Sequence, residues 1–389
     1  MINPLINLYL AHKYKHLNVK EFKNRYQKEI SQISIGCSFN PEHWIFYKDA
    51  DSPYAINNDK HQGEIVLKVA KFIVEDLKIK NIRLSIRWSE VYKNGEIDLT
   101  YYKDLFNYIL SQDVKITLNV GPIKTMRWPE ETVPEDILLQ LKSRPDKEVF
   151  ITAESELGQI SLSYVHALLQ KLKSEFTNEQ LEKIETFQTN NEAFNKFGHF
   201  GWTMSDEFEM KVVEIVNQEF PNKRFLFNSA GRNDLNRVTK LVFKLANKLN
   251  KPFTDFVIGY NYYFKVPQTA KNFILKYFDN LWIAIPGSMS TSKLKKLCKD
   301  KGFTIEVSEL QGEPWLGIDA PGNSLSDFLY SLIRCFQSIL NLNDQKRSII
   351  RYWGIEDLVV KKLKGENSKE HEKIFDLIKE INNYGSTEK

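Results

Sequence analysis

Residues 81–120 have the sequence NIRLSIRWSEVYKNGEIDLTYYKDLFNYILSQDVKITLNV. The stretch begins with a short β-rich run at 81–86, continues through an amphipathic segment at 101–111, and ends with a second β-rich run at 115–120. Strands that are buried on both faces are nearly continuous in apolar residues, whereas a helix that covers them is apolar on one side only. The stretch therefore predicts a strand–helix–strand unit with parallel strands.

The same alternation is repeated along the chain. Further strands are predicted at 33–39, 184–189, 224–228, 256–262, 303–307 and 348–352, and further helices at 64–77, 161–175, 206–217, 234–249, 292–299 and 325–340. Eight strands that alternate with helices favour a (β/α)₈ TIM barrel of the α/β class over an open, doubly wound sheet. An open sheet usually has a Gly-rich phosphate-binding turn after an early strand, but here the first strand ends in Gly36-Cys-Ser-Phe-Asn.

The barrel is expected to be a single domain. Residues 1–30 are polar and helix-prone, which predicts an N-terminal helical extension, and residues 31–389 are predicted to form the barrel together with a C-terminal helix at 367–384. We find no internal repeat, no low-complexity tract and no linker rich in Pro, Gly or Ser in the sequence.

The composition excludes several classes of function. The chain is 42% hydrophobic and 13% aromatic, as expected of a globular protein, and its net charge of +4 is spread evenly, so we predict no nucleic-acid partner. No apolar run approaches membrane-spanning length, which predicts no membrane partner. The seven histidines form no HxH or HExxH pair, so neither a metal nor another cofactor is expected. Nothing in the sequence predicts an oligomeric state.

Three cysteines, Cys37, Cys298 and Cys335, lie far apart in the sequence and form no CxxC pair. The N-terminus has no basic region before its weakly apolar residues, and Asn3 and Pro4 interrupt them. Unpaired cysteines and the lack of a signal peptide predict reduced thiols and a cytoplasmic location.

Two glutamates follow predicted strands. The fourth strand continues into Asn191-Glu192, and the seventh is followed by Glu309. Active sites of TIM barrels lie at the C-terminal ends of the strands, so the two carboxyl groups are expected at one rim. Cleavage of a glycosidic bond needs one neutral carboxyl group and one charged carboxylate. If the enzyme retains anomeric configuration, the two groups should lie about 5–5.5 Å apart; a separation near 9 Å would favour inversion.

Arg83 interrupts the apolar run of the second predicted strand. A cation that points into a barrel is costly to bury unless it is paired. Arg83 is therefore expected either to hold down the pKa of one catalytic carboxyl group or to form a structural ion pair, and the two roles are compatible.

Several motifs together resemble a known superfamily. Asn191-Glu192 after the fourth strand and Glu309 after the seventh are similar to the signature of the clan A glycoside hydrolases, and residues 82–90 resemble the second strand of its β-glucosidase-like members. A closer resemblance is to a group of mostly uncharacterised bacterial barrel proteins described as cellulase-like glycosyl hydrolases. The similar stretches are Gly36-Cys-Ser-Phe, Arg127-Trp-Pro-Glu, Gln188-Thr-Asn-Asn-Glu-Ala-Phe, Glu309-Leu-Gln-Gly-Glu-Pro-Trp and Trp353-Gly-Ile-Glu.

The resemblance implies a role for each matching residue. It makes Glu192 the acid/base, Glu309 the nucleophile that Arg83 steadies, and Asn191 the group that hydrogen-bonds the sugar 2-hydroxyl. It also implies that Tyr263 hydrogen-bonds the nucleophile and that Trp353 forms the floor of the sugar site.

For other residues the sequence leaves two interpretations of their role open. Glu313 is a rival nucleophile to Glu309, and otherwise could contact a sugar hydroxyl or Arg127. Glu192 could be a surface or capping residue. Trp128 and Trp353 could be packing residues rather than sugar platforms, the inward tyrosine could be Tyr260 or Tyr262 instead of Tyr263, and His43 could contact substrate or have no role. The chain departs from the group at Glu131-Thr-Val-Pro-Glu-Asp and at Asp357-Leu-Val-Val, near the expected rim.

The sequence as a whole predicts a retaining O-glycoside hydrolase that acts on a carbohydrate, with a β linkage implied by the resemblance. Two alternatives remain at this stage. A transglycosidase would use the same two glutamates with a sugar acceptor in place of water, and an inactive barrel would bind a glycan or a protein through an altered cleft.

Overall fold

The computed structural model describes residues 17–42, 60–93, 95–126, 131–196, 198–229, 232–262, 291–311, 324–338 and 347–384. Eight of the described strands close into a barrel in which every neighbouring pair is parallel. In order around the barrel these strands are β1 (Ile33–Ser38), β2 (Asn81–Ser85), β5 (Lys115–Asn119), β7 (Ile184–Gln188), β9 (Arg224–Ser229), β10 (Phe256–Tyr262), β11 (Thr304–Gln311) and β12 (Ser348–Trp353), which pairs with β1. The predicted TIM barrel is confirmed.

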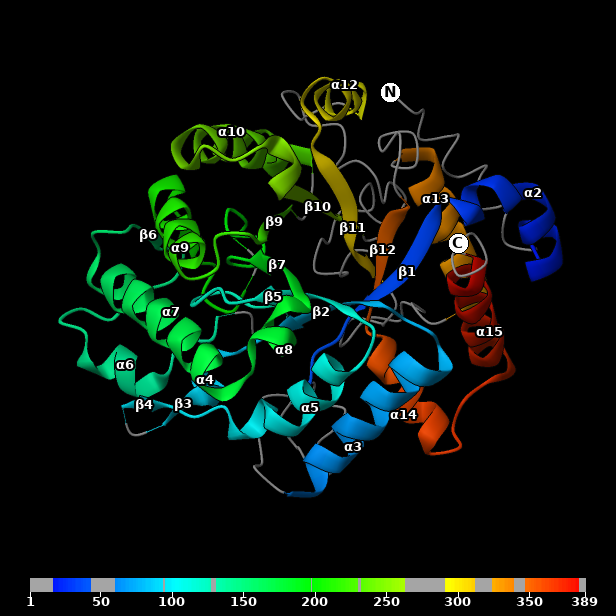
Figure 1. Cartoon of the computed structure of the whole chain (residues 1–389), viewed down its shortest axis with the longest axis horizontal. Coiled ribbons are helices and arrows are strands. Elements are labelled where there is room, and N and C mark those ends of the chain that lie inside the picture. The colour runs from blue at the N-terminus through cyan, green and yellow to red at the C-terminus, as the bar shows by residue number, and fades with distance from the viewer. Residues whose placement is uncertain are drawn as a thin grey trace.

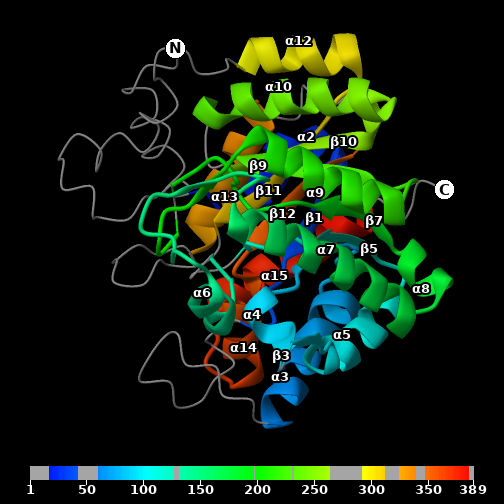
Figure 2. The same cartoon turned by 90° about the vertical axis from the view of Figure 1, so that its left-hand side faces the viewer.

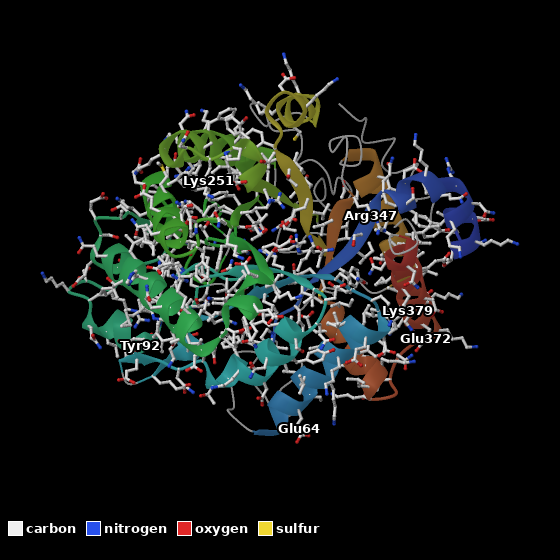
Figure 3. All side chains as sticks on the ribbon, viewed as in Figure 1. Glu64, Tyr92, Lys251, Arg347, Glu372 and Lys379 are labelled. Atoms are coloured by element: carbon white, nitrogen blue, oxygen red, sulfur yellow. The ribbon has the colours of Figure 1, made fainter. Side chains whose placement is uncertain are left out.

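Helices surround the barrel, as Figures 1 and 2 show. Those that follow strands are α3 (Lys60–Lys71) with the π-helical turn η2 (Phe72–Asp76), α5 (Thr100–Ser111), α7 (Glu156–Glu175), α9 (Asp206–Glu219), α10 (Arg232–Leu249), α12 (Thr291–Lys301), α13 (Leu325–Ser338), α14 (Ile355–Leu363) and α15 (Lys369–Tyr384). The short elements between them are α4 (Trp88–Val91), β3 (Tyr92–Lys93), β4 (Glu96–Ile97), α6 (Glu135–Gln140), β6 (Phe150–Ile151), α8 (Asn178–Glu182), β8 (Thr203–Met204) and η3 (Phe253–Asp255). In Figure 3 the labelled Glu64 of α3 and Lys379 of α15 lie on this outer layer.

A helix, α2 (Val19–Ser31), precedes the first strand. The side chain of Asn18 caps it by accepting a hydrogen bond from the backbone N–H of Glu21 at 2.9 Å. Phe22 and Tyr26 of α2 are buried against Phe336 of α13. This helix therefore packs on the outer helical layer beside α15 (Figure 1). Within the described ranges, no helix is both long and apolar enough to cross a membrane.

The strands begin and end close to where the apolar runs predict, with one informative exception. The predicted strand at 303–307 extends as β11 to Gln311, so that Glu309 lies inside the strand rather than after it. The register of β11 shifts against β12 between Val307 and Leu310. Such a bulge depends on the neighbouring strands, which is why the local sequence does not reveal it.

The two faces of the barrel strands differ in chemistry. Residues such as Ile82 and Leu84 of β2 belong to the hydrophobic core that packs under the helices. Between them, Arg83 is fully buried and lies in register with Ser38 of β1 and Thr117 of β5. Because successive strand residues point to opposite faces, the interior of this barrel receives polar side chains. In many TIM barrels branched apolar side chains dominate the interior.

An ion pair fills the interior below the rim. Arg351 of β12 contacts the carboxylate of Glu306 on β11 and donates a hydrogen bond to Oγ1 of Thr117 at 2.9 Å. Both charged side chains are buried. Gly36 of β1 lies against this pair, because a Cβ atom there would come within 3.2 Å of the Arg351 side chain and 2.6 Å of a backbone oxygen.

The buried pair leads to a stability prediction. Glu306→Ala should lower the free energy of unfolding by about 3–5 kcal/mol, because it leaves a buried guanidinium without its counter-charge. The double variant Glu306→Leu/Arg351→Met removes both charges and should recover most of that loss. Urea unfolding of both variants measures the difference, and a double variant no more stable than Glu306→Ala would contradict the interpretation.

Candidate active site

Arg83 is the centre of a hydrogen-bond network at the C-terminal end of the barrel. Its Nη1 donates to Oε1 of Glu309 at 2.6 Å, its Nη2 to Oδ1 of Asn191 at 2.6 Å, and its Nε to Oε1 of Gln188 at 2.6 Å. The side chain of Arg83 is fully buried and that of Glu309 is 2% exposed. A planar guanidinium presents its donors at fixed angles, so it fixes the relative positions of all three acceptors.

The bulge in β11 explains how Glu309 reaches this network. Two successive residues of a regular strand face opposite sides of the sheet. Here the Ser308 hydroxyl donates to Oδ1 of Asn261 at 2.5 Å while Glu309 pairs with Arg83, so both side chains enter the barrel interior. Gly259 makes room for Ser308, because a Cβ atom at this position would lie 2.7 Å from the Ser308 hydroxyl.

Glu192 lies in the turn after β7 with a backbone φ of +44°. This left-handed conformation is uncommon for a residue with a side chain and needs support from its surroundings. The backbone N–H of Glu192 donates to Oδ1 of Asn228 at 2.9 Å. The buried Lys124 ammonium donates to the carbonyl oxygen of Asn195 at 2.8 Å and reaches that of Glu192 at 3.5 Å. These contacts hold the turn in the conformation that buries the Glu192 side chain.

Asn190 anchors the same turn to two other segments. Its Oδ1 accepts hydrogen bonds from the backbone N–H groups of Ile123 and Lys124 at 3.0 and 2.9 Å, and its Nδ2 donates to Oε1 of Glu209 on α9 at 2.6 Å. Gly121 permits the close approach, because a Cβ atom there would lie 2.6 Å from the Cα of Asn190. Burial raises the pKa of Glu209 to about 7, although hydrogen bonding and Arg237 offset the effect in part.

Two asparagines that the sequence did not single out connect the glutamates. Asn228 is the penultimate residue of β9. Its Nδ2 donates to Oδ1 of Asn191 at 2.7 Å and to Oδ1 of Asn261 at 3.3 Å. Asn261 of β10 donates from Nδ2 to Oε1 of Glu192 at 2.5 Å. An asparagine in or just after an apolar run is the only local signal for these residues, and turns carry the same signal.

The structure therefore brings together four of the residues named from the sequence: Arg83, Asn191, Glu192 and Glu309. Both side-chain hydrogen bonds of Asn191 to described residues use Oδ1, so its NH₂ group is the end that can donate to a ligand. Trp353 is the last residue of β12, is 9% exposed, and lies in register with Ser38. The remaining predicted site residues lie outside the described ranges: His43, Arg127, Trp128, Tyr263 and Glu313.

Asn40 is a further polar residue at this rim. It follows β1, its side chain is 2% exposed, and within the described part of the chain neither its amide oxygen nor its amide nitrogen has a hydrogen-bond partner. Buried amides are costly unless they are hydrogen-bonded. Asn40 therefore has hydrogen-bonding capacity for a hydroxylated ligand.

One departure from the resembling group has a structural explanation. The carboxylate of Glu131 accepts hydrogen bonds from the backbone N–H groups of His199 and Gly201, at 2.6 and 3.1 Å. It thereby ties the segment after β5 to the segment after Glu192. In this chain, position 131 therefore anchors the segment that follows the Glu192 turn.

This arrangement can perform acid/base and nucleophilic chemistry. Glu309 lies beside a guanidinium as an ion pair, the charged form that a nucleophile needs. Glu192 is held from another strand in the same network. Among the described residues, no group of three or more His, Cys, Asp or Glu side chains is placed to hold a metal ion.

Comparison with solved structures supports the fold. Neither a family model nor a curated protein matches the sequence. Native xylanase 10B from Thermotoga maritima is 14% identical, with 96% of this chain and 100% of that chain covered at a TM-score of 0.50. An intracellular xylanase from Thermoanaerobacterium saccharolyticum, in complex with xylotriose, is 16% identical over 85% of this chain and 88% of that chain, with a TM-score of 0.47. The GH53 catalytic domain from Ignisphaera aggregans is 15% identical over 84% of this chain and 85% of that chain, with a TM-score of 0.46.

The buried carboxyl group of Glu209 leads to a prediction about pH. Its folded-state pKa of about 7 exceeds its ordinary value of 4.5, so between these values the folded protein binds a proton that the unfolded chain has released. The contribution of Glu209 to stability should be fully present below about pH 4.5 and should be lost as the pH rises through about 7.

Glu209→Gln is the matched variant, because its amide oxygen can still accept from Asn190 and does not titrate. Relative to the wild type, this variant should become progressively more stable from pH 5 to pH 7.5. Urea unfolding at several pH values measures the trend, and a stability difference that does not change with pH would contradict it.

Proposed function

We propose that the protein is a retaining O-glycoside hydrolase that cleaves a β-linked glycoside by double displacement. The observation that carries the proposal is the buried network in which Arg83 pairs with Glu309 while Asn191, Asn228 and Asn261 connect that pair to Glu192. Two carboxyl groups held on one barrel rim from different strands are what glycoside cleavage requires.

In the first step Glu309 attacks the anomeric carbon. A bond forms between its carboxylate oxygen and that carbon, the bond to the leaving oxygen breaks, and Glu192 gives its proton to the departing oxygen. In the second step Glu192 takes a proton from water, the water oxygen bonds to the anomeric carbon, and Glu309 leaves as a carboxylate. Glu192 is then protonated again, and the product is a free sugar.

The other residues of the rim have supporting roles in this proposal. Arg83 stabilises the negative charge of Glu309 before and after the covalent intermediate. The NH₂ group of Asn191 is oriented to donate to a hydroxyl of the sugar. Trp353 would form part of the floor beneath it, a role supported by its place at the C-terminal end of β12. For Tyr263 beside Glu309, and for Arg127, Trp128 and Glu313 around the substrate, the proposal rests on the sequence resemblance. For His43 it rests on its place after the first strand.

The clan A glycoside hydrolases are the superfamily that this proposal favours. The barrel shared with Thermotoga maritima xylanase 10B makes xylosides the first sugars to test. The three cysteines are buried and form no disulfide with one another, which supports a reducing, cytoplasmic setting.

The proposal predicts a covalent adduct on Glu309. A panel of 2,4-dinitrophenyl 2-deoxy-2-fluoro-β-glycosides of xylose, glucose and cellobiose should label the wild type, because the fluorine slows breakdown of the glycosyl-enzyme more than its formation. Intact and peptide mass spectrometry should place one sugar on Glu309, and Glu309→Gln should show none.

Glu313→Gln is the control, because Glu313 lies four residues away and is the rival nucleophile; it should still be labelled on Glu309. An adduct on Glu313 would keep the glycosidase and overturn the assignment of Glu309. Absence of labelling by every sugar of the panel, together with no hydrolysis of the matching unfluorinated glycosides, would count against the enzyme and favour a barrel that only binds its partner.

A further inference from the structure

The orientation of each amide around Glu192 is determined by donors that cannot act as acceptors. The backbone N–H of Glu192 donates to Asn228, so the atom that faces it is the Oδ1 of Asn228. The guanidinium of Arg83 donates to Asn191, so the atom that faces it is the Oδ1 of Asn191. The opposite end of the Asn228 amide is therefore its NH₂ group, which donates to Asn191 and to Asn261.

This chain of contacts also orients Asn261. Its Oδ1 accepts from the Asn228 amide at 3.3 Å and from the Ser308 hydroxyl at 2.5 Å, so its NH₂ group is the end that faces Glu192. The distance from Nδ2 of Asn261 to Oε1 of Glu192 is 2.5 Å, and the two side chains are 2% and 4% exposed. In this buried setting a flipped Asn261 would lose its hydrogen bonds with Glu192 and Asn228, because the Asn228 NH₂ group only donates and a carboxylate only accepts.

We propose that Asn261 is the positioning residue of the acid/base: its amide group holds Oε1 of Glu192 and thereby makes Oε2 the oxygen that carries and transfers the proton. This inference rests on the proposed function and deepens it. An amide NH₂ group only donates hydrogen bonds, so a proton on Oε1 would face the amide hydrogens. The carbonyl oxygen of a protonated carboxyl group is the better acceptor, and the amide therefore selects Oε1 for that role.

The contact has two consequences for catalysis. It favours the charged form of Glu192, because a hydrogen bond to a carboxylate stabilises it, and so makes the protonated group a stronger acid. It also restrains the position of Oε1, so that in this proposal Oε2 is the oxygen that faces the leaving group. General acid catalysis depends on this geometry as well as on acidity.

Asn261→Ala leaves the surrounding charges unchanged, whereas Asn261→Asp adds a carboxylate beside Glu192. The charged groups that the structure describes around Glu192 and its network are Lys124 after β5, Arg83 of β2, Glu309 of β11, Glu209 of α9 through Asn190, and Asp234 of α10 through Lys124. Asn261→Ala therefore isolates the effect of the amide group, and Asn261→Asp combines the loss of the donor with an added negative charge.

Two substitutions test the assignment without any substrate. Asn261→Asp keeps the shape of the side chain and replaces the donor with a carboxylate, and Asn261→Ala removes the donor. In protein labelled with [δ-¹³C]glutamate, the Glu192 resonance is identified by its loss in Glu192→Gln. We expect its titration midpoint to rise by about one pH unit in Asn261→Ala and by more in Asn261→Asp.

Asn119→Asp is the matched control, since Asn119 is also a buried asparagine at the C-terminal end of a barrel strand, and its Oδ1 accepts a hydrogen bond from the backbone N–H of Gly121 at 3.1 Å. The titration midpoint of Glu192 should shift less in Asn119→Asp than in Asn261→Asp. Unchanged midpoints in both Asn261 variants, or an equal shift in Asn119→Asp, would overturn the assignment.

The leaving group provides a kinetic test that a purely structural role would fail. For phenyl β-xyloside, whose poor leaving group needs a proton, kcat/KM should fall about 10–100-fold in Asn261→Asp. For 2,4-dinitrophenyl β-xyloside, which departs without one, it should fall less than about 3-fold. Equal losses on both substrates would overturn the proposed role. If the Glu192 titration midpoint shifts in the Asn261 variants but the wild type cleaves no glycoside, the proposed function is overturned and the assigned contact is supported.

Discussion

The guanidinium group of Arg83 is completely buried inside the barrel, where a charge without partners costs several kcal/mol. Its three donor nitrogens contact Gln188, Asn191 and Glu309, which come from two strands that are not neighbours in the barrel. Because the guanidinium is planar and rigid, satisfying its charge also fixes where Glu309 and the Asn191-Glu192 turn lie. The placement of both candidate catalytic glutamates therefore depends on the burial of one cation from a third strand.

Polar packing continues above and below Arg83. The Arg351–Glu306 pair fills the layer beneath it, and asparagine amides at the rim connect Glu309 to Glu192. Side chains held by hydrogen bonds with fixed donors and acceptors have fewer alternative positions than apolar side chains of similar size. A barrel filled in this way holds its rim residues in one arrangement, as a site that transfers a proton at a particular atom needs.

The sequence predicted the architecture well and the site in part. Apolar runs identified the eight barrel strands to within a few residues, because both faces of each strand are buried. Arg83 could be singled out because a cation inside an apolar run demands a partner. The length of β11 could not be predicted, since the bulge that turns Ser308 and Glu309 inward arises from pairing with β10 and β12. Asn228 and Asn261 were missed because only the closed barrel shows that their amides meet Glu192. For Tyr263 and Glu313, which lie outside the described ranges, the family resemblance is the sole argument.

The stereochemistry of cleavage tests most directly whether Glu309 and Glu192 act as a nucleophile and an acid/base. Proton NMR spectra recorded during hydrolysis of the unfluorinated form of the β-glycoside that labels Glu309 would resolve the anomeric proton of the first-formed sugar. Double displacement predicts that the β-anomer appears first and that the α-anomer accumulates later by mutarotation. An α-anomer that appears first would mean single displacement by water, and would contradict a covalent role for Glu309.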